Sequence, residues 1–192
     1  MVSATKYFFT VSTSVFSLFF ICSCSLLPQP DNIPVCYYDL GIPEQAELSA
    51  GKVVTVLPFS SLSGERFRMV QRTKFLLEND DNNKWQMPPG SLVTKYLTLF
   101  FRQDLSSGGN TARSITLGGT VTAFENDGEN AVLGLVYRIT FPGVDSQRRV
   151  AVQRNILIKE KLLNNKPASF ASAMAKAMKK AAECMVKDIN SK

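Results

Sequence analysis

The sequence predicts an α+β fold, a two-layer sandwich in which two amphipathic helices cover one face of a mixed or antiparallel sheet. Three observations favour this class. A helical pattern precedes three alternating strand patterns, and a second, longer helical pattern closes the chain. Two helices with apolar stripes can together cover one face of such a sheet. The apolar content of 45% and the charged content of 20% are typical of a globular domain with a core.

The first 24 residues have the pattern of a bacterial lipoprotein leader. A single lysine precedes an uncharged apolar run that is short for a membrane span, which needs roughly 20 apolar residues. The run ends in Ile21-Cys22-Ser23-Cys24, which resembles a lipobox, and the bulky residues before Cys22 make it the poorer site. We therefore predict a lipoprotein signal peptide over residues 1–23 and a covalent lipid on Cys24. An uncut signal anchor is the alternative.

The lipid would hold the mature chain at a membrane, because several acyl chains on one residue give stable anchoring. Ser25 follows the cysteine, where an Asp would favour retention at the inner membrane. We expect an outer-membrane lipoprotein that faces the periplasm. Residues 24–34 contain three prolines and predict an extended, lipidated tether, and residues 35–191 are predicted to form the domain.

Five short segments open the predicted domain. Residues 35–40 indicate an edge strand, and the β-branched run at 53–57 indicates a central one. Residues 67–72 alternate apolar and arginine side chains, as expected for a half-buried strand. Residues 74–78 are predicted to return as its hairpin partner, and the polar residues 79–83 to form a turn.

An amphipathic helix is predicted over residues 91–105. Pro88 and Pro89 mark its start, because proline is tolerated in the first turn of a helix and not further in. The apolar residues recur at three- and four-residue spacing, which gives one buried stripe. The stripe consists of Leu92, Val93, Tyr96, Leu97, Phe100, Phe101 and Leu105.

Three long strands are predicted next, each with apolar residues on alternate positions. The segment 125–130 contains the Asp-Gly pair of a hairpin turn. The inner faces are predicted to carry Ile115, Leu117, Gly119, Val121 and Ala123 in the first strand, Leu133, Leu135, Tyr137, Ile139 and Phe141 in the second, and Val150, Val152, Arg154, Ile156 and Ile158 in the third.

A long helix is predicted to close the chain, starting between Pro167 and Ser169. Lysines occupy one side, and the other side carries an apolar stripe over about five turns. The stripe consists of Phe170, Ala173, Met174, Ala177, Met178, Ala181, Met185 and Ile189. Packing against the sheet is the favoured role of this stripe, and a lipid-facing surface is the alternative.

The composition excludes several kinds of active site. The chain has no histidine, which removes Ser-His-Asp and Cys-His catalysis and histidine metal sites. No nucleophile elbow or phosphate-binding loop is present, and the acidic residues of 125–130 lack the spacing of a calcium loop. We therefore predict no enzyme activity, no catalytic residues, no metal and no cofactor apart from the lipid. Cys36 and Cys184 are candidates for a disulfide or for buried thiols.

The net charge of +6 suits an anionic partner or head group, or a solvated surface. Export to the envelope makes nucleic acid an unsuitable ligand. Solvated strand faces are one interpretation of the strand arginines. The other is contact with a protein partner or lipid head groups, for which the candidates are Arg66, Arg68, Arg72, Arg148, Arg149 and Arg154.

The order of motifs resembles the ABC-type transport auxiliary lipoproteins, the group that includes the paraquat-inducible protein C type. The resemblance covers residues 24–190. It rests on the lipobox at Cys24, the Tyr37-Tyr38-Asp39-Leu40 segment, the strand at 53–58, FRMVQR at 67–72, Lys84-Trp85 before the first helix, the strands TLGGTVTAFE and AVLGLVYRITF, and the closing alanine-rich helix.

The resemblance implies an α/β sandwich tethered to the outer membrane as an auxiliary part of an ABC system with mammalian-cell-entry (MCE) domain proteins. Such systems are thought to move phospholipids between the envelope membranes. The implied partners are the MCE-domain protein, the ABC transporter subunits, phospholipid and further copies of the chain. The run at 54–64 also resembles lipoproteins that activate peptidoglycan synthases or build secretion channels, which is the alternative function. A Ser-Lys hydrolase is a third, less favoured hypothesis.

Overall fold

The computed structural model describes residues 33–49, 52–62, 67–102, 113–142 and 150–192. The chain divides between Pro34 and Val35, and the unit Val35–Lys192 contains all of the elements described below. In chain order these are β1 (Cys36–Tyr38), β2 (Lys52–Val56), β3 (Ser60–Ser61), β4 (Arg68–Thr73), β5 (Leu76–Trp85), α2 (Pro89–Phe100), β6 (Arg113–Asn126), β7 (Asn130–Phe141), β8 (Val150–Lys161) and α3 (Pro167–Asn190).

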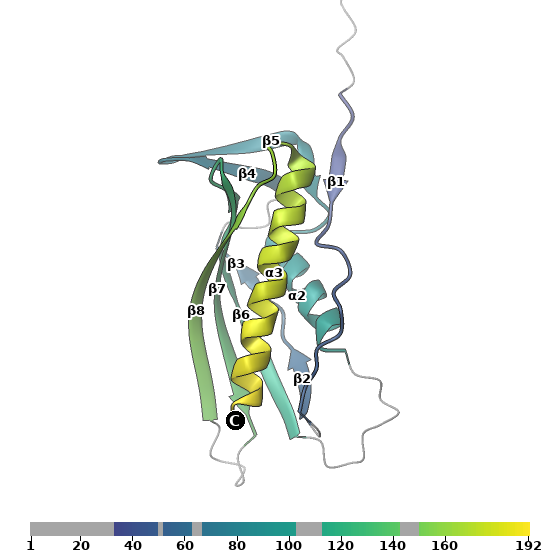
Figure 1. Cartoon of the computed structure of the whole chain (residues 1–192), viewed down its shortest axis with the longest axis vertical. Helices are drawn as coiled ribbons and strands as arrows, with labels where there is room; N and C mark the ends of the chain where they lie inside the picture. The colour runs from purple at the N-terminus through teal and green to yellow at the C-terminus, as the bar shows by residue number, and fades with distance from the viewer. Residues whose placement is uncertain (1–32, 50–51, 63–66, 103–112, 143–149) are drawn as a thin grey trace, which may run out of the picture. The chain divides into compact units, whose positions relative to one another are not determined.

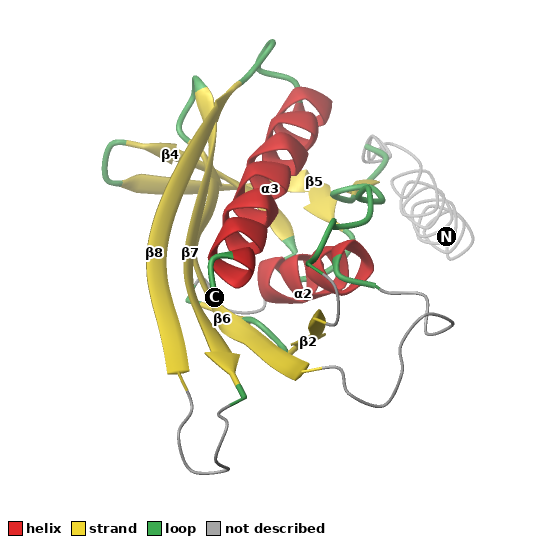
Figure 2. Cartoon of the chain, turned by 60° about the horizontal axis from the view of Figure 1, so that its bottom comes forward, coloured by secondary structure: helices red, strands yellow, loops and turns green. Residues whose placement is uncertain are grey.

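The described strands form one mixed sheet, and both described helices lie on the same face of it (Figure 1). The sheet order is β1-β5-β4-β6-β7-β8, and β2 and β3 pair with β6 beside this path. Helix α3 runs along β7 and β8, while α2 contacts β2, β3 and β6 (Figure 2). The predicted α+β fold with two helices over one sheet face is therefore confirmed.

The antiparallel meander β6-β7-β8 forms one side of the sheet, and its first turn lies where the sequence predicts it. Strands β6 and β7 are joined at Asp127 and Gly128, and Gly128 has a φ of 93°, which glycine adopts without a steric penalty. The inner face of β7 is buried as predicted, with Leu133, Leu135 and Ile139 all at 0% exposure. The β6–β7 and β7–β8 hairpins thus form the sheet surface against which the helices pack.

Strand β6 contains one residue more than its partner requires. Val121 pairs with Leu135 and Ala123 pairs with Gly134, so Thr122 has no partner across the ladder. Such a bulge bends a strand and increases its twist. Simple alternation predicts that Ala123 lies on the inner face of β6. After the bulge it is Phe124 that is buried there instead. The end of β6 then reaches β4 through a single pair, Gln71 and Asn126.

Helix α3 buries the predicted stripe completely. All eight stripe residues are buried, and Met174, Ala177, Met178 and Met185 are at 0% exposure. Replacing one of these methionines by alanine in such a core typically costs about 2–5 kcal/mol. The stripe is therefore core, and it is not a lipid-facing surface.

Helix α2 begins at Pro89 as predicted, and its apolar stripe is buried as far as Phe101. It ends at Phe100, before the predicted end at Leu105, which lies outside the described residues. The helix lies very close to the strand segment before it. A Cβ on Gly90 would stand 2.4 Å from the carbonyl oxygen of Phe59, and Oγ1 of Thr94 accepts a 2.8 Å hydrogen bond from the Phe59 N–H.

Strand β2 is not the central strand that its apolar sequence predicts, and this prediction is wrong. It lies parallel to the first residues of β6, and no other described strand pairs with it. Val54 and Val56 are half-buried against the core, whereas Thr55 is exposed. The helices cover the inner face of the sheet. This burial on one face explains why an edge strand such as β2 has a β-branched sequence. The predicted edge strand at 35–40 is confirmed, since β5 is the one described strand that pairs with β1, at the border of the sheet.

The polar run 79–83 lies within β5, so the turn predicted there is wrong. Its side chains do have turn chemistry, because Oδ1 of Asp80 accepts 2.9 Å hydrogen bonds from the N–H groups of Asn82 and Asn83. The result is a bulge in the β4–β5 pair, in which Arg68 lies opposite Lys84 and Met69 opposite Asp80. The hairpin turn lies at Lys74 and Phe75 instead.

Candidate functional site

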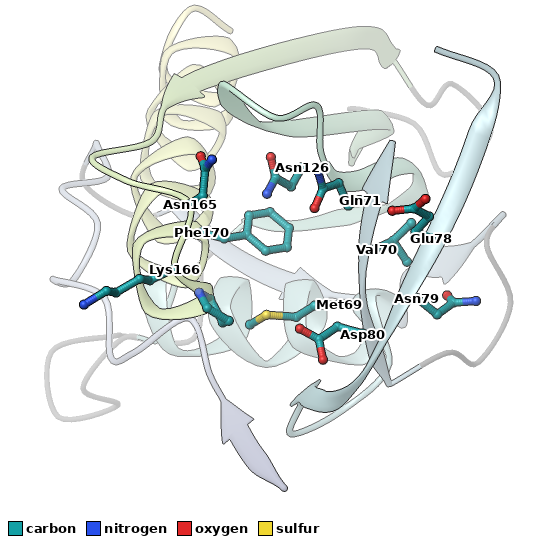
Figure 3. A pocket seen from close by; sticks show the side chains of 11 residues that line it. Met69, Val70, Gln71, Glu78, Asn79, Asp80, Asn126, Asn165, Lys166 and Phe170 are labelled. Carbon is teal, nitrogen blue, oxygen red and sulfur yellow. The ribbon is translucent and has the colours of Figure 1, made fainter. Parts of the chain in front are cut away.

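A cavity of about 230 Å³ opens between the β4–β5 ribbon and the start of α3 (Figure 3). Phe170 projects into it between Asn126 and Met69, and both Phe170 and Met69 are almost fully buried (Figure 3). The cavity thus has an apolar floor under a polar rim. It is lined by Met69, Val70, Gln71, Glu78, Asn79, Asp80, Asn126, Asn165, Lys166, Pro167 and Phe170.

Some of the polar lining is already engaged in holding the backbone. Both carboxylate oxygens of Asp80 accept hydrogen bonds within the bulge, and the amide of Asn83 donates one of them at 2.8 Å. Oδ1 of Asn126 accepts a 2.7 Å hydrogen bond from the N–H of Gly128 in the β6–β7 turn. These side chains shape the cavity, and neither is placed as a free acid or base.

The chemistry that the cavity offers is hydrogen bonding. Its lining contains amides, two carboxylates and one lysine, and it contains no hydroxyl or thiol that could act as a nucleophile. Among the described residues, no group of three His, Cys, Asp or Glu side chains is placed to hold a metal ion. The arrangement therefore suits binding of a polar group.

The three described candidate arginines are each paired with a carboxylate on the same domain. Arg72 makes a bidentate pair with Glu125 at 2.5 and 2.9 Å, and Arg68 lies 3.0 Å from Asp81. Arg154 is on β8, separated from β4 by β6 and β7 in the sheet. The structure does not gather these arginines into one basic surface. Arg66, Arg148 and Arg149 lie outside the described residues.

Arg154 belongs to a cluster that joins the sheet to α3. The Tyr137 hydroxyl donates a 2.8 Å hydrogen bond to Oδ2 of Asp188, and Arg154 donates to both oxygens of that carboxylate at 3.3 Å. Burial, followed by the hydrogen bond to Asp188, raises the pKa of Tyr137 well above its ordinary value. The hydroxyl stays protonated and donates to Asp188, so the contacts of this cluster hold α3 on the sheet.

Cys36 and Cys184 do not form the candidate disulfide. Both thiols are free, and both residues are exposed, so neither is the buried thiol of the alternative hypothesis. Cys36 lies on β1 opposite Asn83, whereas Cys184 lies on the exposed side of α3. The lipidation candidate, Cys24, lies outside the described residues.

The turn between β4 and β5 carries an apolar surface that the sequence analysis missed. We define the apolar tip as Phe75, Leu76 and Leu77, whose exposures are 100%, 56% and 42%. The pattern at 74–78 predicts a return strand, and no Gly, Asn or Asp marks the turn before it. The first turn residue is Lys74, which has a φ of 54°. The missed signal is the unbroken apolar triplet that directly follows a lysine.

These features define a small α+β domain with a polar-rimmed cavity and an exposed apolar hairpin tip. Neither described helix is long and apolar enough to cross a bilayer. No family model matches the chain, and no curated protein does. The comparisons therefore rest on solved structures.

Two solved structures share the fold. One is described only as an uncharacterized protein; it has 15% identity and a TM-score of 0.63, over 81% of this chain and 99% of that one. The other is protein XCC0632 from Xanthomonas campestris, of the family DUF330, with 15% identity and a TM-score of 0.64, over 81% and 95% of the two chains. At this level of identity the likeness shows a common fold alone.

Proposed function

We propose that the chain is a lipoprotein of the outer membrane that faces the periplasm and acts as a non-enzymatic docking component of an MCE-type ABC transport system. Such a system would move phospholipids between the two envelope membranes. The observation that carries the proposal is the Ile21-Cys22-Ser23-Cys24 sequence, followed after a short proline-rich stretch by the folded unit that begins at Val35. This order suits an anchor, a spacer and a periplasmic domain.

The chemistry of the described residues supports docking over catalysis. The described lining of the cavity consists of amides, charged groups and apolar residues without a hydroxyl or thiol, and the three described candidate arginines are paired with carboxylates. A domain of this kind would provide a docking surface at the membrane, and its partners would carry out the transport. We expect those partners to be an MCE-domain protein and the ABC transporter subunits, with phospholipid and further copies of the chain as additional contacts.

The spacer limits where the partners can be. Eleven Cα–Cα steps separate Cys24 from Val35 (35 minus 24). A fully extended chain of this length spans at most about 40 Å. The domain would therefore work close to the inner leaflet of the outer membrane. It would receive or dock a transport assembly there, and it would not itself bridge the periplasm.

The test is recovery of partners with the full-length chain. An affinity-tagged chain is expressed from its own locus, cross-linked in intact cells and purified from solubilised envelopes. We expect MCE-domain and ABC subunits to be recovered. Recovery of a peptidoglycan synthase or a secretion channel instead would establish the alternative function, and recovery of none of these proteins would reject the proposal.

A matched variant tests the location. Ser25→Asp changes only the residue after Cys24, and an Asp at this position favours the inner membrane. We expect this variant to be lipidated but to lose partner recovery. If it still recovers the same partners in the same amount, docking does not depend on the outer membrane.

A further inference from the structure

We propose that the apolar tip of the β4–β5 hairpin inserts into the phospholipid surface to which the chain is tethered. The tip is the three consecutive residues Phe75, Leu76 and Leu77, and Phe75 is completely exposed. Single apolar residues are common on protein surfaces, whereas a contiguous apolar patch marks an interaction site. This inference rests on the proposed function for the tether and goes beyond it for the contact.

The tip has no structural role within the domain that would account for its composition. The ribbon pairs with β1 at Asn83 to Trp85, far from the tip, and it joins β6 through one pair, Gln71 with Asn126. Beyond that pair only the rungs Arg72–Leu77 and Thr73–Leu76 remain, and each is made within the hairpin itself. The ribbon extends past β7 and β8 in both views (Figures 1 and 2). Leu76 and Leu77 are partly covered within the domain, and further burial of the tip can come only from an external surface.

The turn presents the apolar side chains at the apex. The first turn residue, Lys74, has a φ of 54°, in the left-handed region that glycine favours at this place in a hairpin. A lysine tolerated there adds a positive charge directly beside Phe75. A cation next to protruding apolar side chains matches the boundary between anionic head groups and acyl chains. A convex tip of this kind suits a bilayer surface, which needs no preformed pocket.

Charged residues on the ribbon limit the depth of insertion. Arg72 and Glu78 flank the tip, and Glu78 is exposed. Arg72 is bound to Glu125 of β6, which keeps that end of the ribbon at the body of the domain. The apolar part therefore spans the turn and the first two pairs of the hairpin, those of Leu76 and Leu77. This is enough to reach the boundary between head groups and acyl chains, which lies roughly 5–10 Å deep.

The tip and the tether can reach the same membrane. The folded unit begins at β1, which pairs with β5 at Asn83 to Trp85. The tip lies at the other end of β5, and the seven steps from Leu76 to Asn83 span no more than about 24 Å. The eleven Cα–Cα steps from Cys24 to Val35 reach further than that, at most about 40 Å. A lipid anchor would thus keep the tip within reach of the surface.

The test measures whether the apex enters acyl chains. The chain has one tryptophan, Trp85, which is fully buried and gives a constant background. Phe75→Trp places a second tryptophan at the apex, and Gln153→Trp places one at an exposed position on β8, near the other end of the domain. Full-length, lipidated variants are mixed with vesicles of phosphatidylethanolamine and phosphatidylglycerol that contain brominated acyl chains. Trp85 emission confirms that each variant is folded.

We expect the added fluorescence of Phe75→Trp to shift to shorter wavelength and to lose its larger part to bromine quenching, while Gln153→Trp stays unquenched. Equal quenching of both variants would overturn the proposal. An unquenched Phe75→Trp on protein that floats with the vesicles would also overturn it, but it would leave the proposed lipid anchor supported. If the protein does not float at all, the tether fails as well. An apex that shifts only after a purified partner protein is added would assign the tip to that protein and reject the bilayer.

Discussion

The hydroxyl of Tyr137 on β7 donates a 2.8 Å hydrogen bond to Oδ2 of Asp188, near the end of α3. Arg154 of the neighbouring strand β8 donates to the same carboxylate, so one side chain of the helix holds two strands. Tyr137 is only 1% exposed, so its hydroxyl has no alternative partner in water. This contact fixes the C-terminal end of the long helix on the sheet.

Tyr137→Phe is expected to lower the free energy of unfolding by about 1–2 kcal/mol, because Asp188 loses a buried donor. Burial and the hydrogen bond raise the pKa of Tyr137 in the folded state above its ordinary value of 10.0. The unfolded chain therefore releases this proton first, and the stability it contributes is lost as the pH rises above about 10. Urea unfolding at neutral and alkaline pH measures both effects. Tyr37→Phe is the exposed control and should keep the alkaline loss.

Asp80→Ala should destabilise the domain by about 1–2 kcal/mol, because the bulge in β5 loses the acceptor for two N–H groups and one amide. Its neighbour provides the control, since Asp81 is mostly exposed and makes one ion pair with Arg68. Exposed pairs contribute at most about 1 kcal/mol. Thermal unfolding of Asp80→Ala and Asp81→Ala compares the two, and equal losses would remove the structural role given to Asp80.

Lys74→Gly is expected to raise the free energy of unfolding by up to about 1 kcal/mol, because the left-handed conformation is strained for any residue with a Cβ. Lys74→Ala keeps the Cβ and should give no such gain. Denaturant unfolding of the two variants separates backbone strain from loss of the charge. A gain of the same size in both would attribute it to the lysine side chain.

Cys24→Ala should abolish lipidation and membrane association and leave a folded domain, because the anchor and the core are separate parts of the chain. Cys22→Ala is the matched control, two residues earlier in the same apolar run, and it should still be lipidated. Mass spectrometry of the N-terminal peptide and fractionation of envelopes check both variants. Membrane retention of Cys24→Ala would indicate the uncut signal anchor.

Cys36 and Cys184 should both react with a thiol reagent in the folded, unreduced protein, since both are free and exposed. Cys36→Ser and Cys184→Ser should each lose one modification. Intact mass after labelling counts the modified thiols. A native protein that reacts at neither position until it is reduced would demonstrate a disulfide in the exported form.

The sequence predicts the regular part of the fold well, because long periodic patterns have one favourable arrangement. The stripe of α3 repeats over the whole helix, and the predicted inner-face residues Leu133, Leu135, Tyr137 and Ile139 of β7 are all buried. The predicted hairpin turn at Asp127 and Gly128 is also correct, since its backbone conformation needs a glycine. Local chemistry alone determines these elements.

The parts that the sequence does not predict depend on neighbours that are distant in the chain. The apolar run of β2 indicates a central strand. In the structure, β2 and β4 both pair with β6, and β2 has no described strand on its other side. Asp80 has the side chain of a turn residue, and its backbone nevertheless continues as a strand because β4 lies beside it. The candidate arginines looked free in the sequence because their carboxylate partners belong to other elements, as Glu125 and Asp188 do.

The unpaired Thr122 determines the direction in which the β4–β5 hairpin projects from the sheet. Without this residue, Ala123 and Phe124 would still face Gly134 and Leu133, so the core needs no extra length at this point. The residue instead turns the last rungs of β6 toward Gln71, the attachment of the ribbon. A deletion of Thr122 would therefore keep the interior intact and redirect Phe75, which separates the orientation of this surface from the stability of the domain.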